Sequence, residues 1–132
     1  MPERLRISTG TPWEAAVGYS RAIRVGNMVW TAGTTASDVD GNVIGENDAY
    51  AQMHACLTKI QGALAQAGAK MEDVVRVDIF VTDMSRWQDV GRAHAEFFRD
   101  IRPANFLVEV KGLVDPRMLV EVAVTAVVDD GR

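Results

Sequence analysis

The chain has 132 residues, a formal net charge of −4 and 48% hydrophobic residues. This length corresponds to one compact domain, residues 1–132, and the apolar content is sufficient for a core without disulfides or metals. The acidic balance disfavours nucleic-acid partners, because binding to phosphates requires an excess of basic side chains.

The sequence also argues against several kinds of site. A single cysteine, Cys56, excludes an intramolecular disulfide, and with two histidines there is no cysteine/histidine zinc pattern. The sequence contains no phosphate loop or dinucleotide fingerprint. It has no apolar signal-peptide stretch and no run of the ~18 apolar residues that a membrane span requires. We therefore expect a cytoplasmic protein that needs no cofactor, binds no metal and contacts no membrane.

The first predicted element is a β-hairpin. Residues 22–25 and 28–31 alternate between apolar and polar side chains, which predicts two antiparallel strands. The pair Gly26-Asn27 between them is typical of a two-residue hairpin turn. A second turn is expected at Asp40-Gly41-Asn42.

A long helix is predicted over residues 48–67. Polar residues at 45–48 can cap its start, and Gly68 ends the pattern where a left-handed C-cap is expected. Its apolar residues recur at helical spacing: Met53, Cys56, Leu57, Ile60 and Leu64. Because Cys56 belongs to this stripe, we interpret it as a core residue.

The next two elements are a buried strand and a second helix. Residues 74–82 are rich in β-branched side chains, and one face would carry Val75, Val77, Ile79 and Val81. Ser85 and Gln88 stand at the spacing of a capping box, so a helix is expected to begin there and to end near Asp100. Its predicted stripe consists of Trp87, Val90, His94 and Phe97.

Two further strands, at 106–110 and 118–128, complete the pattern. The order of elements predicts an α+β fold: one mixed sheet with both helices packed against one face. Several strands are apolar on both faces, so an isolated chain would expose an apolar sheet surface. We expect self-association to bury it.

Two glutamates are candidate catalytic carboxylates. Glu121 and Glu109 each lie in a run of apolar strand residues. Such a glutamate either points to solvent, the commoner case, or lines a cleft where burial raises its pKa toward general-base chemistry. The pattern alone does not choose between them.

Other candidates have equally ordinary structural interpretations. Tyr19 lies in a predicted loop, where its phenol orients a ligand or, more commonly, caps the edge of the core. Gly33 and Thr34 follow a strand, either as a small-ligand cradle or as a routine strand exit. His94 and Trp87 on the second helix are more often packing residues than site residues.

Six fragments, in this order and spacing, together resemble the Rid/YjgF family, the reactive-intermediate deaminases, and the closing run 119–122 adds to the likeness. They cover 18–23, 31–34, 80–84, 97–98, 102–104 and 108–110. The resemblance spans nearly the whole chain and implies a chorismate-mutase-like fold that assembles as a homotrimer. It also implies ligand clefts between adjacent subunits.

The resemblance further implies roles for individual residues. Members of the family hydrolyse 2-imino acids with a tyrosine, a glutamate that positions the attacking water, and an arginine that holds the substrate carboxylate. Tyr19 and Glu121 match the first two, and main-chain groups at Gly33 and around Leu107 match ligand contacts. The arginine, however, is replaced by Asn105.

A second departure lies on the second helix, where relatives often carry asparagine at the position of Gly91 and where His94 could fill part of the space. Asparagine at 105 cannot form a bidentate ion pair with a carboxylate. We therefore expect a pocket that hydrolyses an imine, enamine or other small reactive metabolite, distinct from the standard 2-imino acid deaminase. The alternatives are a noncatalytic metabolite-binding or chaperone-like trimer and, disfavoured by the acidic charge, an endoribonuclease.

Overall fold

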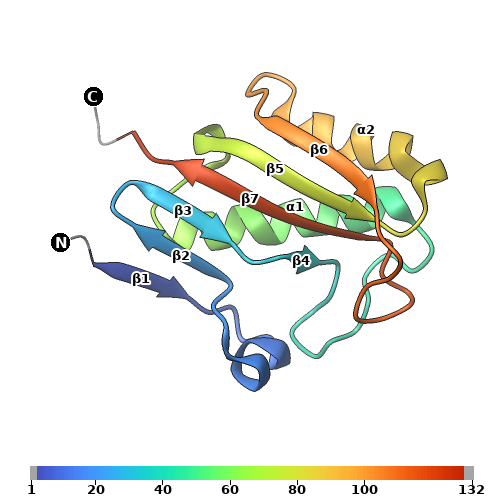
Figure 1. Cartoon of the computed structure of the whole chain (residues 1–132), viewed down its shortest axis with the longest axis horizontal. Coiled ribbons are helices and arrows are strands. Elements are labelled where there is room, and N and C mark those ends of the chain that lie inside the picture. The colour runs from blue at the N-terminus through green and yellow to red at the C-terminus, as the bar shows by residue number, and fades with distance from the viewer. Residues whose placement is uncertain (1–2, 130–132) are drawn as a thin grey trace.

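The computed structural model describes residues 3–129, which form one mixed sheet with two main helices on one of its faces (Figure 1). The α+β architecture expected from the order of elements is confirmed. In chain order the elements are β1 (Arg4–Ile7), η1 (Glu14–Gly18), β2 (Ala22–Val25), β3 (Met28–Thr31), β4 (Thr34–Thr35), α1 (Ala49–Gln66), η2 (Met71–Asp73), β5 (Val74–Val81), η3 (Met84–Arg86), α2 (Trp87–Phe98), β6 (Ala104–Glu109) and β7 (Val120–Val127).

The sheet is built around β7. The strand order is β1-β2-β3-β7-β5-β6, and the short β4 also pairs with β7. All pairs are antiparallel except β5 with β6, which are parallel and joined through α2. A helical crossover is the usual way to connect two parallel neighbours.

The best-patterned elements lie where the sequence predicts them. β2 and β3 form the hairpin, with Ala22 opposite Thr31 and Val25 opposite Met28. Asp48 caps α1 by accepting a hydrogen bond from the Ala51 amide at 3.0 Å. The predicted apolar stripe of α1 is fully buried against the sheet. Cys56 is itself fully buried, which confirms that it is a core residue, and this burial raises the pKa of its thiol to about 12.

The structure corrects the predicted face of β5. A register shift between Val74 and Arg76 interrupts its pairing with β7. Val75 is consequently exposed, whereas Val74, Val77, Ile79 and Val81 are buried. A bulge adds one residue to a strand and so shifts the alternation of its side chains.

The start of the second helix also differs from the prediction. Asp83, and not Ser85, accepts the capping hydrogen bond, from the Ser85 amide at 3.0 Å, and the turn η3 precedes α2. Trp87, expected on the apolar stripe, is 53% exposed. The residues of α2 that are buried are Val90, Ala93 and Phe98.

Neither α1 nor α2 covers the opposite face of the sheet (Figure 1). Trp30 and Val108 are exposed there and Phe80 is half-buried. Self-association through this apolar face stays a prediction. No helix in the described part of the chain is both long and apolar enough to span a membrane.

Candidate functional site

The candidate site lies where β3, the second strand of the hairpin, ends and the chain continues toward β4. β7 pairs first with β3, at Met28–Trp30, and then with β4, so the chain leaves the sheet at Ala32 and Gly33. At the break the Val124 amide donates a hydrogen bond to Thr31 Oγ1, at 2.9 Å, in place of a backbone carbonyl. The break leaves the Gly33 carbonyl free to accept from a side chain.

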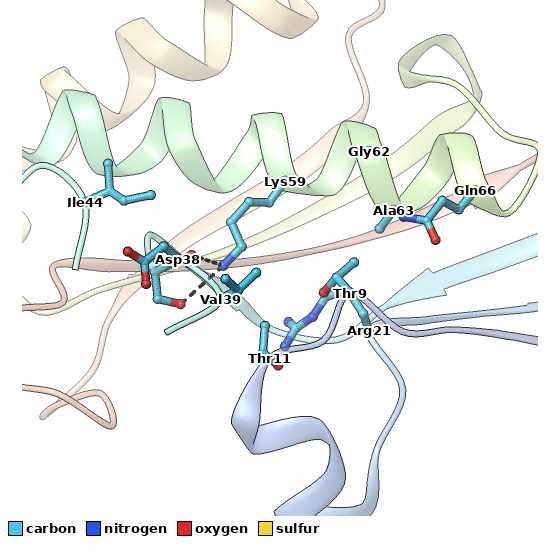
Figure 2. Close-up of a pocket in the computed structure, with 11 residues that line it drawn as sticks. Thr9, Thr11, Arg21, Asp38, Val39, Ile44, Lys59, Gly62, Ala63 and Gln66 are labelled. Atoms are coloured by element: carbon cyan, nitrogen blue, oxygen red, sulfur yellow. Dashed lines mark hydrogen bonds between the residues drawn. The ribbon is translucent and has the colours of Figure 1, made fainter. Parts of the chain in front are cut away.

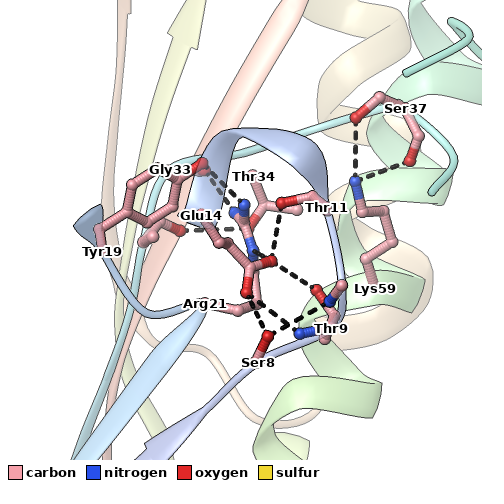
Figure 3. Close-up of polar contacts among 12 residues, drawn as sticks. Ser8, Thr9, Thr11, Glu14, Tyr19, Arg21, Gly33, Thr34, Ser37 and Lys59 are labelled. Carbon is pink, nitrogen blue, oxygen red and sulfur yellow. Dashed lines mark hydrogen bonds and ion pairs between the residues drawn. The ribbon is translucent and has the colours of Figure 1, made fainter. Parts of the chain in front are cut away.

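The side chain that binds Gly33 is Arg21, which is 4% exposed (Figure 3). Its guanidinium donates to the Gly33 carbonyl at 2.8 Å, to Thr34 Oγ1 at 3.2 Å and to the Tyr19 hydroxyl at 3.1 Å. Arg21 therefore fixes the position of the predicted site residues Tyr19, Gly33 and Thr34 relative to one another.

Glu14, at the start of η1, balances the charge of Arg21. The Nε to Oε2 distance is 3.4 Å, and both side chains are 5% exposed. Burial raises the pKa of Glu14, but hydrogen bonds from Thr11, Ser8 and Thr9 together outweigh burial and bring the pKa to about 2. The ion pair is thus a fixed, ionised part of the protein.

Glu121, on β7, packs against Gly33. A Cβ at position 33 would overlap Glu121 Oε2 and lie 2.9 Å from its Cδ, so any larger residue at this position would displace the Glu121 carboxylate. Burial raises the pKa of the Glu121 carboxyl, and Arg21 opposes that rise. The result is a half-buried carboxylate of increased basicity.

Two hollows meet at Glu121 and Gly33. The smaller, of about 180 Å³, is also lined by Tyr19, Arg21 and Thr35. The larger, of about 410 Å³, lies along β5 and the loop after β6, with Phe80 and Leu113 in its wall. A small molecule in either hollow would contact the Glu121 carboxylate.

A second group of predicted residues lies at β6 and α2. Asn105 Nδ2 is 3.4 Å from His94 Nε2. Burial lowers the pKa of the half-buried His94. Trp87 and Gly91 lie on the same helix, and a Cβ at Gly91 would meet open space. Leu107 is half-buried on β6 opposite Ile79.

Within one chain the two groups stand on opposite faces of the sheet. Asn105 pairs with Val77, which pairs with Val124, and both valines face the helices. Glu121 pairs with Phe80, on the uncovered face. Directly paired residues project to the same side, and successive residues alternate. One subunit therefore does not bring Asn105 and Glu121 to a single ligand.

The structure distinguishes the two candidate glutamates by their surroundings. Glu109 is exposed and accepts a hydrogen bond from the Met84 amide at 2.8 Å, at the start of η3. Glu121 lines the hollows. Arg102 and Arg117, two arginines that lie close to β6 and β7 in the sequence, both have partners: Arg117 pairs with Asp115 at 2.8 Å, and Arg102 donates to the Arg99 carbonyl at 3.2 Å.

Arg21 and Glu14 are site residues that sequence reasoning missed. Their ion pair joins residues seven apart across the exposed turn η1, and no periodic pattern reveals it. One available signal was the cluster of hydroxyl residues Ser8, Thr9 and Thr11 just before Glu14. Within residues 3–129, no three His, Cys, Asp or Glu side chains are grouped to hold a metal.

The fold and the site define a small α+β domain with a half-buried glutamate beside a tyrosine and a buried arginine. A family model described as Endoribonuclease L-PSP matches residues 9–128. The chain therefore belongs to this family, also known as the Rid/YjgF family.

Relatives and solved structures agree with this assignment. The 3-aminoacrylate deaminase RutC of Acinetobacter baylyi is 34% identical, over 96% of this chain and 98% of the relative. Rv2704 of Mycobacterium tuberculosis, of the YjgF/YER057c/UK114 family, is 47% identical with a TM-score of 0.87, covering 96% of this chain and 100% of Rv2704. The YjgF structure from E. coli is 29% identical with a TM-score of 0.80, covering 93% and 98%. The predicted family and fold class are confirmed.

Proposed function

We propose that this protein is a cofactor-free hydrolase that removes ammonia from small imine or enamine metabolites. The observation that carries the proposal is Glu121, a half-buried carboxylate of raised pKa, lying against Gly33 where two hollows meet. A carboxylate of this kind can accept a proton from a water molecule that attacks an electrophilic carbon. The deaminase relative RutC supports this class of chemistry.

The reaction would proceed by addition and elimination. Water adds to the carbon of a C=N bond that is protonated on nitrogen, while Glu121 takes a proton from the water, which gives a neutral carbinolamine. Glu121 returns that proton to the nitrogen, the C–N bond breaks, and ammonia leaves as the C=O bond forms, with the hydroxyl proton passing to Glu121 and then to solvent. An enamine first takes a proton at carbon and so becomes the protonated imine. Imine and water are thus converted to carbonyl compound and ammonia.

Tyr19 would orient the substrate in this scheme. Its hydroxyl accepts a hydrogen bond from Arg21 at 3.1 Å, so its own proton is available to a ligand in the smaller hollow. The buried guanidinium keeps the hydroxyl in place. Main-chain groups at Gly33 and Thr34 would supply further contacts.

The second group of residues would come from a neighbouring subunit of a homotrimer. Asn105, with Trp87, Gly91, His94 and Leu107, lies on the other face of the sheet from Glu121. A second copy would place such a group opposite Glu121, and the uncovered apolar face gives a reason for copies to associate.

Asn105 sets the choice of substrate. A carboxylate held by arginine gains a charge-assisted hydrogen bond of about 1.5–3 kcal/mol, which a neutral amide does not supply. Loss of that contact weakens binding of a 2-imino acid by roughly tenfold to a hundredfold. We therefore propose small imines and enamines other than the standard 2-imino acids as preferred substrates.

The test is imine hydrolysis. An amino-acid oxidase generates 2-iminopropanoate in situ, and semicarbazide trapping reports the imine that survives; 3-aminoacrylate is assayed in parallel. Wild type, Glu121→Gln and Asn105→Arg are compared, with Glu109→Gln as the matched control. We expect Glu121→Gln to abolish turnover, Glu109→Gln to retain it, and Asn105→Arg to increase turnover of 2-iminopropanoate. Unchanged turnover in Glu121→Gln would refute the role of Glu121.

A noncatalytic metabolite-binding trimer is the second candidate. The observation that favours it is that Arg21 already has partners within the chain. Its guanidinium contacts Glu14, Gly33, Thr34 and Tyr19, so it is not free to bind a substrate. Native mass spectrometry of the purified protein distinguishes the two functions. A retained metabolite that is bound without turnover supports the binder.

A further inference from the structure

A third cavity, of about 360 Å³, lies beside α1, between the segment 9–11 and the loop 37–44 (Figure 2). Its volume is within the ~300–1,000 Å³ typical of small-ligand sites. It shares Arg21, Ser37 and Lys59 with the smaller hollow at Glu121, but Glu121 itself does not line it. The cavity therefore lies next to the proposed catalytic pocket, but most of the residues that line it belong to it alone.

Lys59 brings a positive charge to this cavity. Its ammonium donates to the carbonyls of Thr35 at 2.7 Å and Ser37 at 2.8 Å, and to Ser37 Oγ at 3.3 Å. All three acceptors are neutral. Among the ion pairs of residues 3–129, none includes Lys59. Burial lowers the pKa of this half-buried lysine, and the nearby carboxylates of Glu14 and Asp38 offset that effect only in part.

The other charged groups around the cavity already have partners. Arg21 is paired with Glu14. Asp38 accepts hydrogen bonds from the amides of Asp40 and Asn42, both at 2.9 Å, within its own loop. Lys59 is thus the charged group in this wall that an anionic ligand would neutralise.

The rest of the wall is largely apolar. Val39 and Ile44 are exposed large hydrophobic residues, and Ala63 is buried on the facing side of α1. Gly62, in the middle of the helix, also lines the cavity, and a Cβ there would meet nothing within 4 Å. An aliphatic chain would cover Val39 and Ile44 from water.

From these observations we infer that the cavity binds a small aliphatic carboxylate. Its carboxylate contacts the Lys59 ammonium, replacing the long contact with Ser37 Oγ, and its hydrocarbon chain packs against Val39, Ile44 and Ala63. The Ser37 hydroxyl is then free to donate to the second carboxylate oxygen. This site does not depend on the proposed hydrolase activity.

Two probes test the inference: 4-methylpentanoate and its neutral counterpart 4-methylpentanamide, titrated by calorimetry and followed by backbone amide NMR. The proteins are wild type, Lys59→Met, the control Lys70→Met at an exposed lysine, and Gly62→Leu, which fills the cavity. We expect wild type and Lys70→Met to bind the carboxylate saturably, with shifts at Val39, Ile44 and Ala63. The amide and Lys59→Met should bind about tenfold to a hundredfold more weakly, as for loss of a charge-assisted hydrogen bond.

Gly62→Leu should not bind the acid. Far-UV circular dichroism establishes that each variant is folded. The comparison of the acid with the amide is made on wild type alone, so it does not depend on the folding of any variant. The inference is wrong if wild type binds neither probe at millimolar concentration, or binds both equally. It is also wrong if folded Lys59→Met or Gly62→Leu binds as wild type does, or if the shifts are confined to Tyr19 and Glu121.

Discussion

The ionised Glu14 makes the stability of the protein depend on pH in a defined window. The pKa of Glu14 is about 2 in the folded protein, against an ordinary value of 4.5. Because the folded pKa is the lower one, the stabilisation is fully present above pH 4.5 and is lost as the pH falls toward 2. At 1.36 kcal/mol per pKa unit, the difference between the folded and the ordinary pKa corresponds to about 3 kcal/mol of stabilisation. About 2 kcal/mol of this stabilisation is lost by pH 3.

The perturbation that tests this account is Glu14→Gln. It removes the titrating group and leaves Arg21 buried without its anion, so we expect the variant to be destabilised at neutral pH by about 3–5 kcal/mol. The decisive quantity is the change in the free energy of unfolding between pH 6 and pH 3. Wild type and the control Glu72→Gln, at an exposed glutamate, should lose about 2 kcal/mol more over this interval than Glu14→Gln.

Urea denaturation followed by circular dichroism at a fixed protein concentration measures the free energy of unfolding at each pH. The concentration must be fixed, because association would also contribute to stability. If wild type and Glu14→Gln lose equal stability between pH 6 and pH 3, the hydrogen bonds to Glu14 do not hold its pKa low, and the reasoning fails.

Three further predictions concern other parts of the structure. Gly33→Ala should displace Glu121 and reduce hydrolysis at least tenfold in a folded protein. The control Gly62→Ala, whose added Cβ meets nothing within 4 Å and which lines neither hollow at Glu121, should not change the rate; equal rates for the two variants in the imine assay would contradict the close approach. Gly62→Ala should raise the free energy of unfolding by about 0.5–1 kcal/mol, because alanine is the better helix former; urea denaturation showing a loss would count against it. Cys56 should be unreactive toward Ellman's reagent in the folded protein and reactive in guanidinium; rapid labelling under native conditions would show that the thiol is accessible.

Local patterns were sufficient to predict the strongest elements. The hairpin depends on a two-residue turn, and α1 depends on one apolar stripe with an N-cap at Asp48, so both are encoded within short segments. The bulge in β5 was not predictable, because it arises from pairing with β7, far along the sequence. β1 was missed for a related reason: Arg4 and Arg6 flank Leu5, and pairing with β2 makes this charged segment a strand.

The candidate site was predicted in part. Glu121 could be proposed as a site residue because its carboxylate lies in an apolar run of the sequence, as that of Glu109 does. Only the structure shows that Glu109 is exposed and accepts a hydrogen bond at the start of η3, whereas Glu121 lines a cavity. Arg21 reaches Gly33 and Thr34 across a strand pair, and such long-range hydrogen bonds leave no periodic signal in the sequence.

The central position of β7 has a consequence for synthesis. This strand, the last along residues 3–129, lies between β3 and β5 and joins the two halves of the sheet. On the ribosome, β2 and β3 can pair early and β5, α2 and β6 can form their crossover, but each half keeps an unpaired inner edge until Val120–Val127 emerges. A nascent chain therefore exposes two open strand edges until β7 emerges and joins the two halves of the sheet.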